Sequence, residues 1–157
     1  MNDIPPDLLT PDLLAAIPLI TGSEPKNTLA IMTFAGPEPD RVFCLNLPAQ
    51  EAEAACRRLA TTAIGLVCSV PNADSVLLAL YTDRLCPGAR RRPFERLQRL
   101  VASRLHGSGF HLVDSFYVAA NGWGSYCCTD PRCRLATPSP LAELHRRTRQ
   151  LREEREP

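Results

Sequence analysis

A nearly continuous apolar run at residues 75–81 (S-V-L-L-A-L-Y) constrains the fold more than any other feature. Such a run is typical of a strand that other elements cover on both faces. Amphipathic helical patterns at 48–64 and 93–106 flank it, and further strand patterns lie beyond them at 41–47 and 110–119. Two strand–helix–strand units in succession predict right-handed crossovers and a sheet with a parallel centre.

Two further segments predict hairpins. The apolar stretch 28–35 is separated from 41–47 by a short proline-rich turn, so the two are expected to pair antiparallel. Asn121-Gly122 is a strong hairpin signal, and residues 123–128 should return antiparallel to the strand before them. The expected fold is a single-domain α/β sandwich with a mixed, roughly five-stranded sheet.

Helices are expected at both ends of the chain. Pro11 suits the first helical position, and Pro18 and Gly22 are expected to end that helix. We place the α/β domain at 1–137 and a charged C-terminal helix or tail at 138–157. The apolar seam of this helix consists of Leu141, Leu144, Thr148 and Leu151. So short a seam is compatible with a solvated helix and with one that docks or self-associates.

The composition limits the partners and the compartment. A net charge of +1 in 157 residues gives no general attraction to nucleic acid, to a membrane or to acidic substrates. The sequence shows neither a signal peptide nor an apolar run near the ~20 residues that span a bilayer. Cysteines number seven, which is odd, and Cys44 and Cys56 fall in patterns typical of core positions. These features predict free thiols in a reducing compartment, the cytoplasm.

The stretch 121–133 (N-G-W-G-S-Y-C-C-T-D-P-R-C) holds the single tryptophan and three of the seven cysteines. A structural metal site needs about four ligands, whereas Cys127 and Cys128 on a strand would point to opposite faces. Only Cys128 and Cys133 could converge, for example with Asp130, so we predict no metal and no cofactor. The cysteines are expected either as free thiols in a turn or with a Cys128–Cys133 disulfide.

Two strand ends are candidate positions for a binding site. In open α/β sheets, ligands bind beyond the carboxyl ends of the parallel strands. Such ends are recognisable at Tyr81-Thr82-Asp83 and just after Leu47. Asp83 is therefore a candidate ligand anchor or general base, although an aspartate there also suits a simple turn.

A basic segment follows Asp83. Seven arginines lie within residues 84–104, and arginine contacts phosphates and carboxylates through paired hydrogen bonds. Arg90, Arg91 and Arg92 are the candidate residues for a small anionic ligand, and a solvated face is the other interpretation. Because no aromatic residues alternate with the arginines, nucleic acid is not an expected partner.

Four motifs, in order along the chain, resemble the largely actinobacterial domain-of-unknown-function family 4192. They are L-L-A-A-I-P-L-I-T-G at 13–22, P-x-x-T-L at 25–29, L-Y-T-D at 80–83 and W-x-S-Y-x-C-T-D-P-x-C at 123–133. The last motif is specific. The family has no established activity, so the resemblance implies no catalytic residues. It marks as family positions Trp123, Ser125, Tyr126, Cys128, Thr129, Asp130, Pro131 and Cys133.

The chain departs from this family pattern in several places. The family commonly has two tryptophans where this chain has Trp123-Gly124, a further cysteine in place of Arg134, and V-D-L-P in place of Leu45-Asn46-Leu47-Pro48. Typical members also continue well beyond the last motif. These differences favour a reduced form that binds without catalysing a reaction.

Three hypotheses for function follow. The first is a non-enzymatic binding or regulatory module, with the loop 123–133 recognising a protein partner or a second copy of the chain. Its candidate ligand-binding residues are Tyr81, Asp83, Trp123, Ser125, Tyr126 and Asp130. The second is a small enzyme acting on a phosphorylated or nucleotide-like ligand in a deep pocket lined by Tyr81, Asp83 and Trp123. The third is a structural protein that self-assembles through the C-terminal helix.

Overall fold

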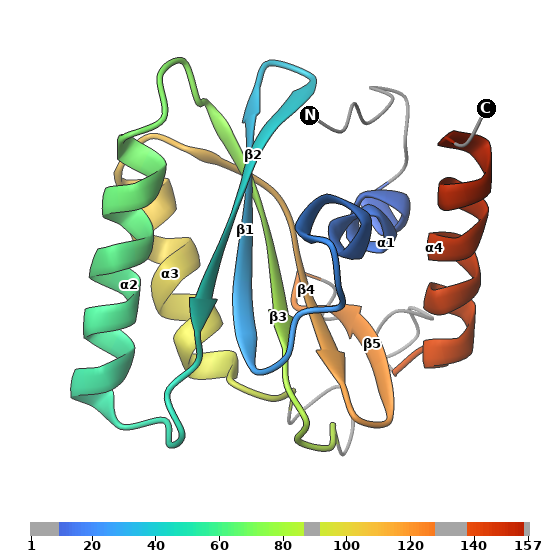
Figure 1. Ribbon diagram of the computed structural model, residues 1–157. Helices are drawn as coiled ribbons and strands as arrows, with labels where there is room; N and C mark the ends of the chain where they lie inside the picture. Colours follow the sequence, from blue (N-terminus) through green and yellow to red (C-terminus); the bar gives the residue numbers. More distant parts are fainter. Residues whose placement is uncertain (1–9, 87–91, 128–137, 156–157) are drawn as a thin grey trace.

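The computed structural model describes residues 10–86, 92–127 and 138–155, which form five strands and four helices (Figure 1). The strands are β1 (Thr28–Ala35), β2 (Glu38–Asn46), β3 (Ser75–Tyr81), β4 (His111–Ala119) and β5 (Gly122–Ser125). The helices are α1 (Thr10–Thr21), α2 (Glu53–Cys68), α3 (Glu95–Gly107) and α4 (Leu141–Arg155). The α/β fold with a mixed five-stranded sheet and helices at both ends is therefore confirmed.

The sheet has the strand order β2-β1-β3-β4-β5. β3 and β4 are adjacent and parallel, whereas β1 pairs antiparallel with both β2 and β3. β2 and β3 therefore run in the same direction with β1 between them, and the crossover through α2 passes over β1. β5 pairs antiparallel with β4 at the other edge. One antiparallel strand thus interrupts the parallel centre that the two crossovers predicted.

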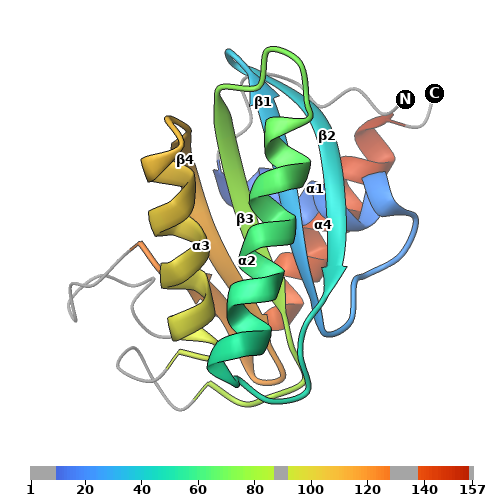
Figure 2. The same ribbon diagram turned by 90° about the vertical axis from the view of Figure 1, so that its left-hand side faces the viewer.

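Helices cover both faces of the sheet and make a three-layer sandwich. α2 and α3 lie side by side on one face, and α1 and α4 lie on the other (Figures 1 and 2). Successive β3 side chains alternate between the two cores: Val76, Leu78 and Leu80 pack with α2 and α3, whereas Leu77 and Ala79 pack with α1 and α4. This double burial explains why β3 is apolar at nearly every position.

The end of α1 and both ends of α2 differ from the sequence prediction, and α2 ends at Cys68, about one turn beyond the predicted residue 64. α1 continues through Pro18 and ends before Gly22, which has a φ of 92°. Burial of the preceding α1 side chains outweighs the one hydrogen bond that Pro18 cannot donate. α2 begins about one turn later than predicted, because Pro48 and Ala49 belong to a loop. The Ala49 carbonyl in this loop accepts a hydrogen bond from the Arg84 side chain at 2.9 Å.

The C-terminal helix α4 packs against α1. Leu144 and Leu151 of the predicted seam are buried, and the Thr148 hydroxyl donates to the Ala15 carbonyl at 2.8 Å. Figure 1 shows the two helices next to each other on one face of the sheet. The seam that could drive self-association is therefore occupied within the chain.

The described cysteines do not all occupy core positions. Cys56 is buried, as the sequence predicted, but Cys44 is exposed on β2. The prediction for Cys44 was wrong because β2 forms an edge of the sheet and is only partly covered. In the described part of the chain, every helix is too short or too polar to span a bilayer.

Candidate functional site

Two adjoining cavities lie at the end of the sheet where β2, β3 and β4 terminate. One, of about 370 Å³, extends toward the loop after β2, and the other, of about 270 Å³, extends toward the start of α4. Asn27, Thr82 and Asp83 line both. The two strand ends singled out in the sequence, at residue 83 and after Leu47, are thus brought together. We call this double cavity the Asp83 crevice.

Asp83 stands at the centre of the crevice with an exposed side chain. Its backbone N–H donates to the side-chain oxygen of Asn27 at 3.2 Å, and the Asn27 amide nitrogen lies 3.5 Å from the Asp83 carboxylate. The Asn27 backbone carbonyl also accepts from the N–H of Leu47 at 2.9 Å. Asn27 thus ties the start of β1 to the ends of β2 and β3. Most of the accepting capacity of the Asp83 carboxylate is left for a ligand.

Phe94 and Arg84 form the wall on the α2–α3 side. The central guanidinium carbon of Arg84 lies 4.2 Å from the centre of the Phe94 ring. Phe94 has a φ of 53° and Asn27 a φ of 47°, a left-handed conformation that asparagine tolerates and phenylalanine rarely adopts. Strained backbone of this kind clusters at binding sites, and both residues line the crevice.

Tyr81 lines the part of the crevice that faces α4. Its hydroxyl is buried and has no hydrogen-bond partner among the residues that the structure describes. Burial, and then the charge of Glu24, raises the pKa of Tyr81, so the phenol stays protonated at neutral pH. A buried hydroxyl without a partner is energetically unfavourable.

Side chains of the segment that follows β4 point alternately to the two faces of the sheet, as they do in a strand. Trp123 packs in the core shared with α1 and α4, whereas Tyr126 packs in the core shared with α2 and α3. Trp123 is only 2% exposed and contacts Phe116 edge to face, with 6.2 Å between the ring centres. The aromatic side chains of this segment are therefore part of the protein interior.

The predicted ligand-binding residues separate into two groups. Tyr81 and Asp83 line the crevice. Trp123, Ser125 and Tyr126 are buried and are not among its lining residues. Asp130 lies outside the described residues. The structure thus brings together the strand-end residues and places the described part of the 123–133 motif elsewhere.

Gly124 lies in close contact with the side chain of Tyr117. A Cβ atom at this position would lie 2.6 Å from the hydroxyl oxygen of Tyr117 and 2.8 Å from its Cζ. A second tryptophan after Trp123 would therefore require Tyr117 to move.

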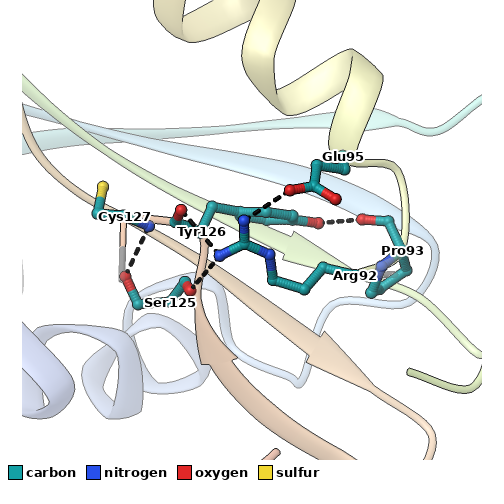
Figure 3. A network of polar contacts seen from close by, with 6 residues as sticks. All are labelled: Arg92, Pro93, Glu95, Ser125, Tyr126 and Cys127. Carbon is teal, nitrogen blue, oxygen red and sulfur yellow. Dashed lines mark hydrogen bonds and ion pairs between the residues drawn. The ribbon is translucent and has the colours of Figure 1, made fainter. Parts of the chain in front are cut away.

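Arg92 is the centre of a buried polar network that holds the segment after β4 against the start of α3 (Figure 3). Its Nη1 donates to the carbonyls of Ser125 at 3.0 Å and Tyr126 at 2.9 Å, and its Nη2 pairs with Glu95 at 2.6 Å. The Tyr126 hydroxyl donates to the Pro93 carbonyl. The guanidinium of Arg92, predicted to contact an anionic ligand, is thus directed into the protein.

A second polar cluster joins β4 to β5. Asp114 accepts hydrogen bonds from the Ser125 hydroxyl at 2.8 Å and the Ser115 N–H at 2.7 Å, and the Cys127 N–H donates to Ser125 Oγ at 3.0 Å. Partial burial and the charge of Asp114 raise the pKa of the Cys127 thiol. Because a raised pKa lowers the thiolate fraction, the cluster suits a structural turn better than a nucleophile.

The other predicted site residues, Arg90, Arg91, Cys128 and Cys133, lie outside the described residues. Within the described ranges, no three His, Cys, Asp or Glu side chains are grouped so that they could hold a metal ion. Cys44, Cys56, Cys68 and Cys127 are free thiols.

Asn27 and Phe94 are among the crevice residues that the sequence does not predict as site residues. Asn27 reaches Asp83 across a chain separation of 56 residues, which no local pattern reveals. An asparagine just before a strand is nevertheless a common choice for left-handed backbone. Phe94 matches the helical spacing of the segment that follows it, so that spacing predicts a core residue and conceals its contact with the crevice.

All three tyrosines of the chain are expected to stay protonated until the protein unfolds. Burial raises the pKa of Tyr81, Tyr117 and Tyr126 above the ordinary value of about 10. The folded state then keeps protons that the unfolded chain releases, so this contribution to stability is complete below pH ~10 and declines above it. An alkaline titration should show tyrosinate absorbance and circular dichroism changing together. Tyrosinate absorbance that rises while the circular dichroism stays native would contradict this burial.

The comparisons with known proteins identify the family. The sequence model of the family described as Domain of unknown function (DUF4192) matches residues 11–151. This range extends from α1 into α4 and includes the whole sheet. Neither the curated proteins nor the solved structures give a significant match. The chain therefore belongs to the family described as Domain of unknown function (DUF4192).

Proposed function

We propose that this protein is a cytoplasmic binding module that holds a small polar ligand in the Asp83 crevice. The observation that carries the proposal is the meeting of two cavities at Asp83, beyond the carboxyl ends of the parallel strands β3 and β4. Open α/β sheets bind their ligands at this kind of position. The free thiols of Cys44, Cys56, Cys68 and Cys127 suit a reducing compartment.

The lining indicates what such a ligand would present to the protein. The Asp83 carboxylate accepts hydrogen bonds, so the ligand would carry an amine, amide or hydroxyl donor. On the α4 side, Val118, Ala119 and Leu141 offer apolar surface for a ring or hydrocarbon portion. Volumes of about 270 and 370 Å³ lie near the lower end for small-molecule sites. The ligand would therefore have the size of a metabolite.

The described lining favours binding over catalysis. It contains neither a cysteine nor a histidine, so it lacks the pairing of one of these nucleophiles with a base that covalent catalysis often uses. Because burial raises the pKa of Tyr81, this phenol stays protonated at neutral pH and is not a base. These features support recognition of an uncharged or cationic donor group by Asp83.

Replacing Asp83 with alanine is expected to weaken ligand-dependent stabilisation without disturbing the fold. A ligand at a hundredfold excess over its Kd raises the free energy of unfolding by about 2.7 kcal/mol. Loss of a hydrogen bond to a charged group weakens binding at least about tenfold, which would remove about half of that increment or more. A thermal-shift screen of small amines, amides and polyols on wild type and Asp83→Ala measures the difference.

Asp40→Ala provides the matched control, because Asp40 is an exposed aspartate near the start of β2, at the opposite end of the sheet. Compounds that stabilise the wild type should stabilise Asp40→Ala equally. Compounds that stabilise Asp83→Ala as strongly as the wild type would place the binding site elsewhere and reject the proposal.

A further inference from the structure

A separate cavity, of about 350 Å³, lies between α2 and α3, the two helices that are side by side in Figure 2. Guanidinium groups dominate its polar lining: Arg57 comes from α2, and Arg96 and Arg99 come from α3. Leu100 and the buried Cys56 supply apolar surface. The cavity shares no lining residue with the Asp83 crevice. We call it the α2–α3 groove.

The positive charge of the groove is only partly neutralised. Arg57 pairs with Glu53 at 2.6 Å, and Glu53 is the single carboxylate in the lining. Arg96 and Arg99 form no ion pair with any residue that the structure describes. Three arginines against one glutamate leave an excess of two positive charges on this part of the surface.

The charge of Arg96 reaches the buried part of the groove. Burial and the charge of Glu51 raise the pKa of the Cys56 thiol, whereas Arg96 acts in the opposite direction. The groove also lies along the first turns of α2 and α3, where unpaired backbone N–H groups add positive potential. An anion beside Arg96 and Arg99, on the α3 wall of the groove, would therefore meet favourable potential.

We propose that the α2–α3 groove binds a small organic anion that has an apolar body. Its carboxylate or phosphate oxygens would contact Arg96 and Arg99, which are suited to paired hydrogen bonds with planar or tetrahedral anions. The Ser103 hydroxyl, also in the lining, provides a further donor. The apolar body would lie against Leu100 and Cys56. This site is independent of the ligand proposed for the Asp83 crevice.

A titration of the ¹⁵N-labelled protein with octanoate, octyl phosphate and octanol tests the proposal. At least one of the two anions is expected to shift the amide signals of α2 and α3, and the stronger of the two identifies the preferred head group. Octanol has the same apolar body without charge and should bind at least about tenfold more weakly, the factor expected when hydrogen bonds to a charged group are lost. Octanol that binds as tightly as both anions would overturn the proposal. So would a titration in which neither octanoate nor octyl phosphate shifts the amide signals of α2 and α3.

Variants separate the groove from general surface charge. The double variant Arg96→Gln/Arg99→Gln should bind the anion at least about tenfold more weakly while its spectrum remains that of a folded protein. Arg58→Gln is the control, because Arg58 is an exposed arginine of α2 outside the groove lining. Unchanged binding by the double variant, or an equal loss with Arg58→Gln, would show that the groove is not the site.

Discussion

Replacing Arg92 with methionine is expected to lower the free energy of unfolding by about 3–5 kcal/mol. Methionine keeps an unbranched, apolar side chain but removes every hydrogen bond of the guanidinium. The Ser125 and Tyr126 carbonyls and the Glu95 carboxylate would lose their contacts with Arg92. Because these groups lie next to an arginine side chain that is only 7% exposed, solvent cannot fully replace what is lost.

Arg57→Met is the matched control for this prediction. Arg57 also forms an ion pair with a glutamate at 2.6 Å, but its side chain is 64% exposed. Exposed pairs within a helix contribute about 0.3–0.5 kcal/mol, so this variant should unfold almost like the wild type. Chemical denaturation measures the free energy of unfolding of both variants. An effect of Arg92→Met as small as that of Arg57→Met would contradict the role assigned to the network.

Replacing Trp123 with alanine is expected to lower the free energy of unfolding by about 3–5 kcal/mol. The change would leave a cavity in the core that Trp123 shares with Phe116, α1 and α4. The backbone β-bridge between Trp123 and Ser139 does not involve the side chain, so the loss is that of core packing. A tryptophan on a recognition surface would behave differently, because its loss would reduce binding and leave stability nearly unchanged.

Leu85→Ala serves as the reference for this second prediction. Leu85 is a large apolar residue that is 67% exposed, so its truncation should change stability by no more than about 0.5 kcal/mol. Comparing the two variants shows whether the loss of stability comes from the burial of the side chain or only from its hydrophobicity. A Trp123→Ala variant that unfolds at the same denaturant concentration as the wild type would show that Trp123 is not a core residue.

Local patterns predict the elements of this fold well and predict their order in the sheet less well. The run at 75–81 indicates a strand covered on both faces, and β3 occupies the centre of the sheet. The two predicted crossovers do not indicate that β1 lies between β2 and β3. The position of β1 depends on contacts between segments that are distant in the sequence. β1 is buried along almost its whole length, whereas every residue of β2 is exposed or only half-buried, as in an edge strand.

In the candidate site, too, local patterns predict some residues, and contacts between distant segments determine the others. Tyr81 and Asp83 are predicted correctly as neighbours at a strand end, because the direction of a parallel strand determines where its end lies. Trp123 and Tyr126 are predicted from residue type alone, whereas in the structure Trp123 of β5 and Tyr126 just after it pack in two different cores. Asn27 completes the crevice through hydrogen bonds to a residue far along the chain. Such a contact depends on the assembled sheet and has no local signature.

The central claim is that the Asp83 crevice binds a small polar ligand, and mapping bound compounds by ¹⁵N chemical shifts tests it most directly. Compounds with amine, amide or hydroxyl donors would be added to the labelled protein, with its backbone amide signals assigned. The account predicts that the largest shifts fall at Asn27, Thr82, Asp83 and Arg84, and that Asp83→Ala removes them. Compounds that bind with their largest shifts elsewhere, and equally well to Asp83→Ala, would contradict it.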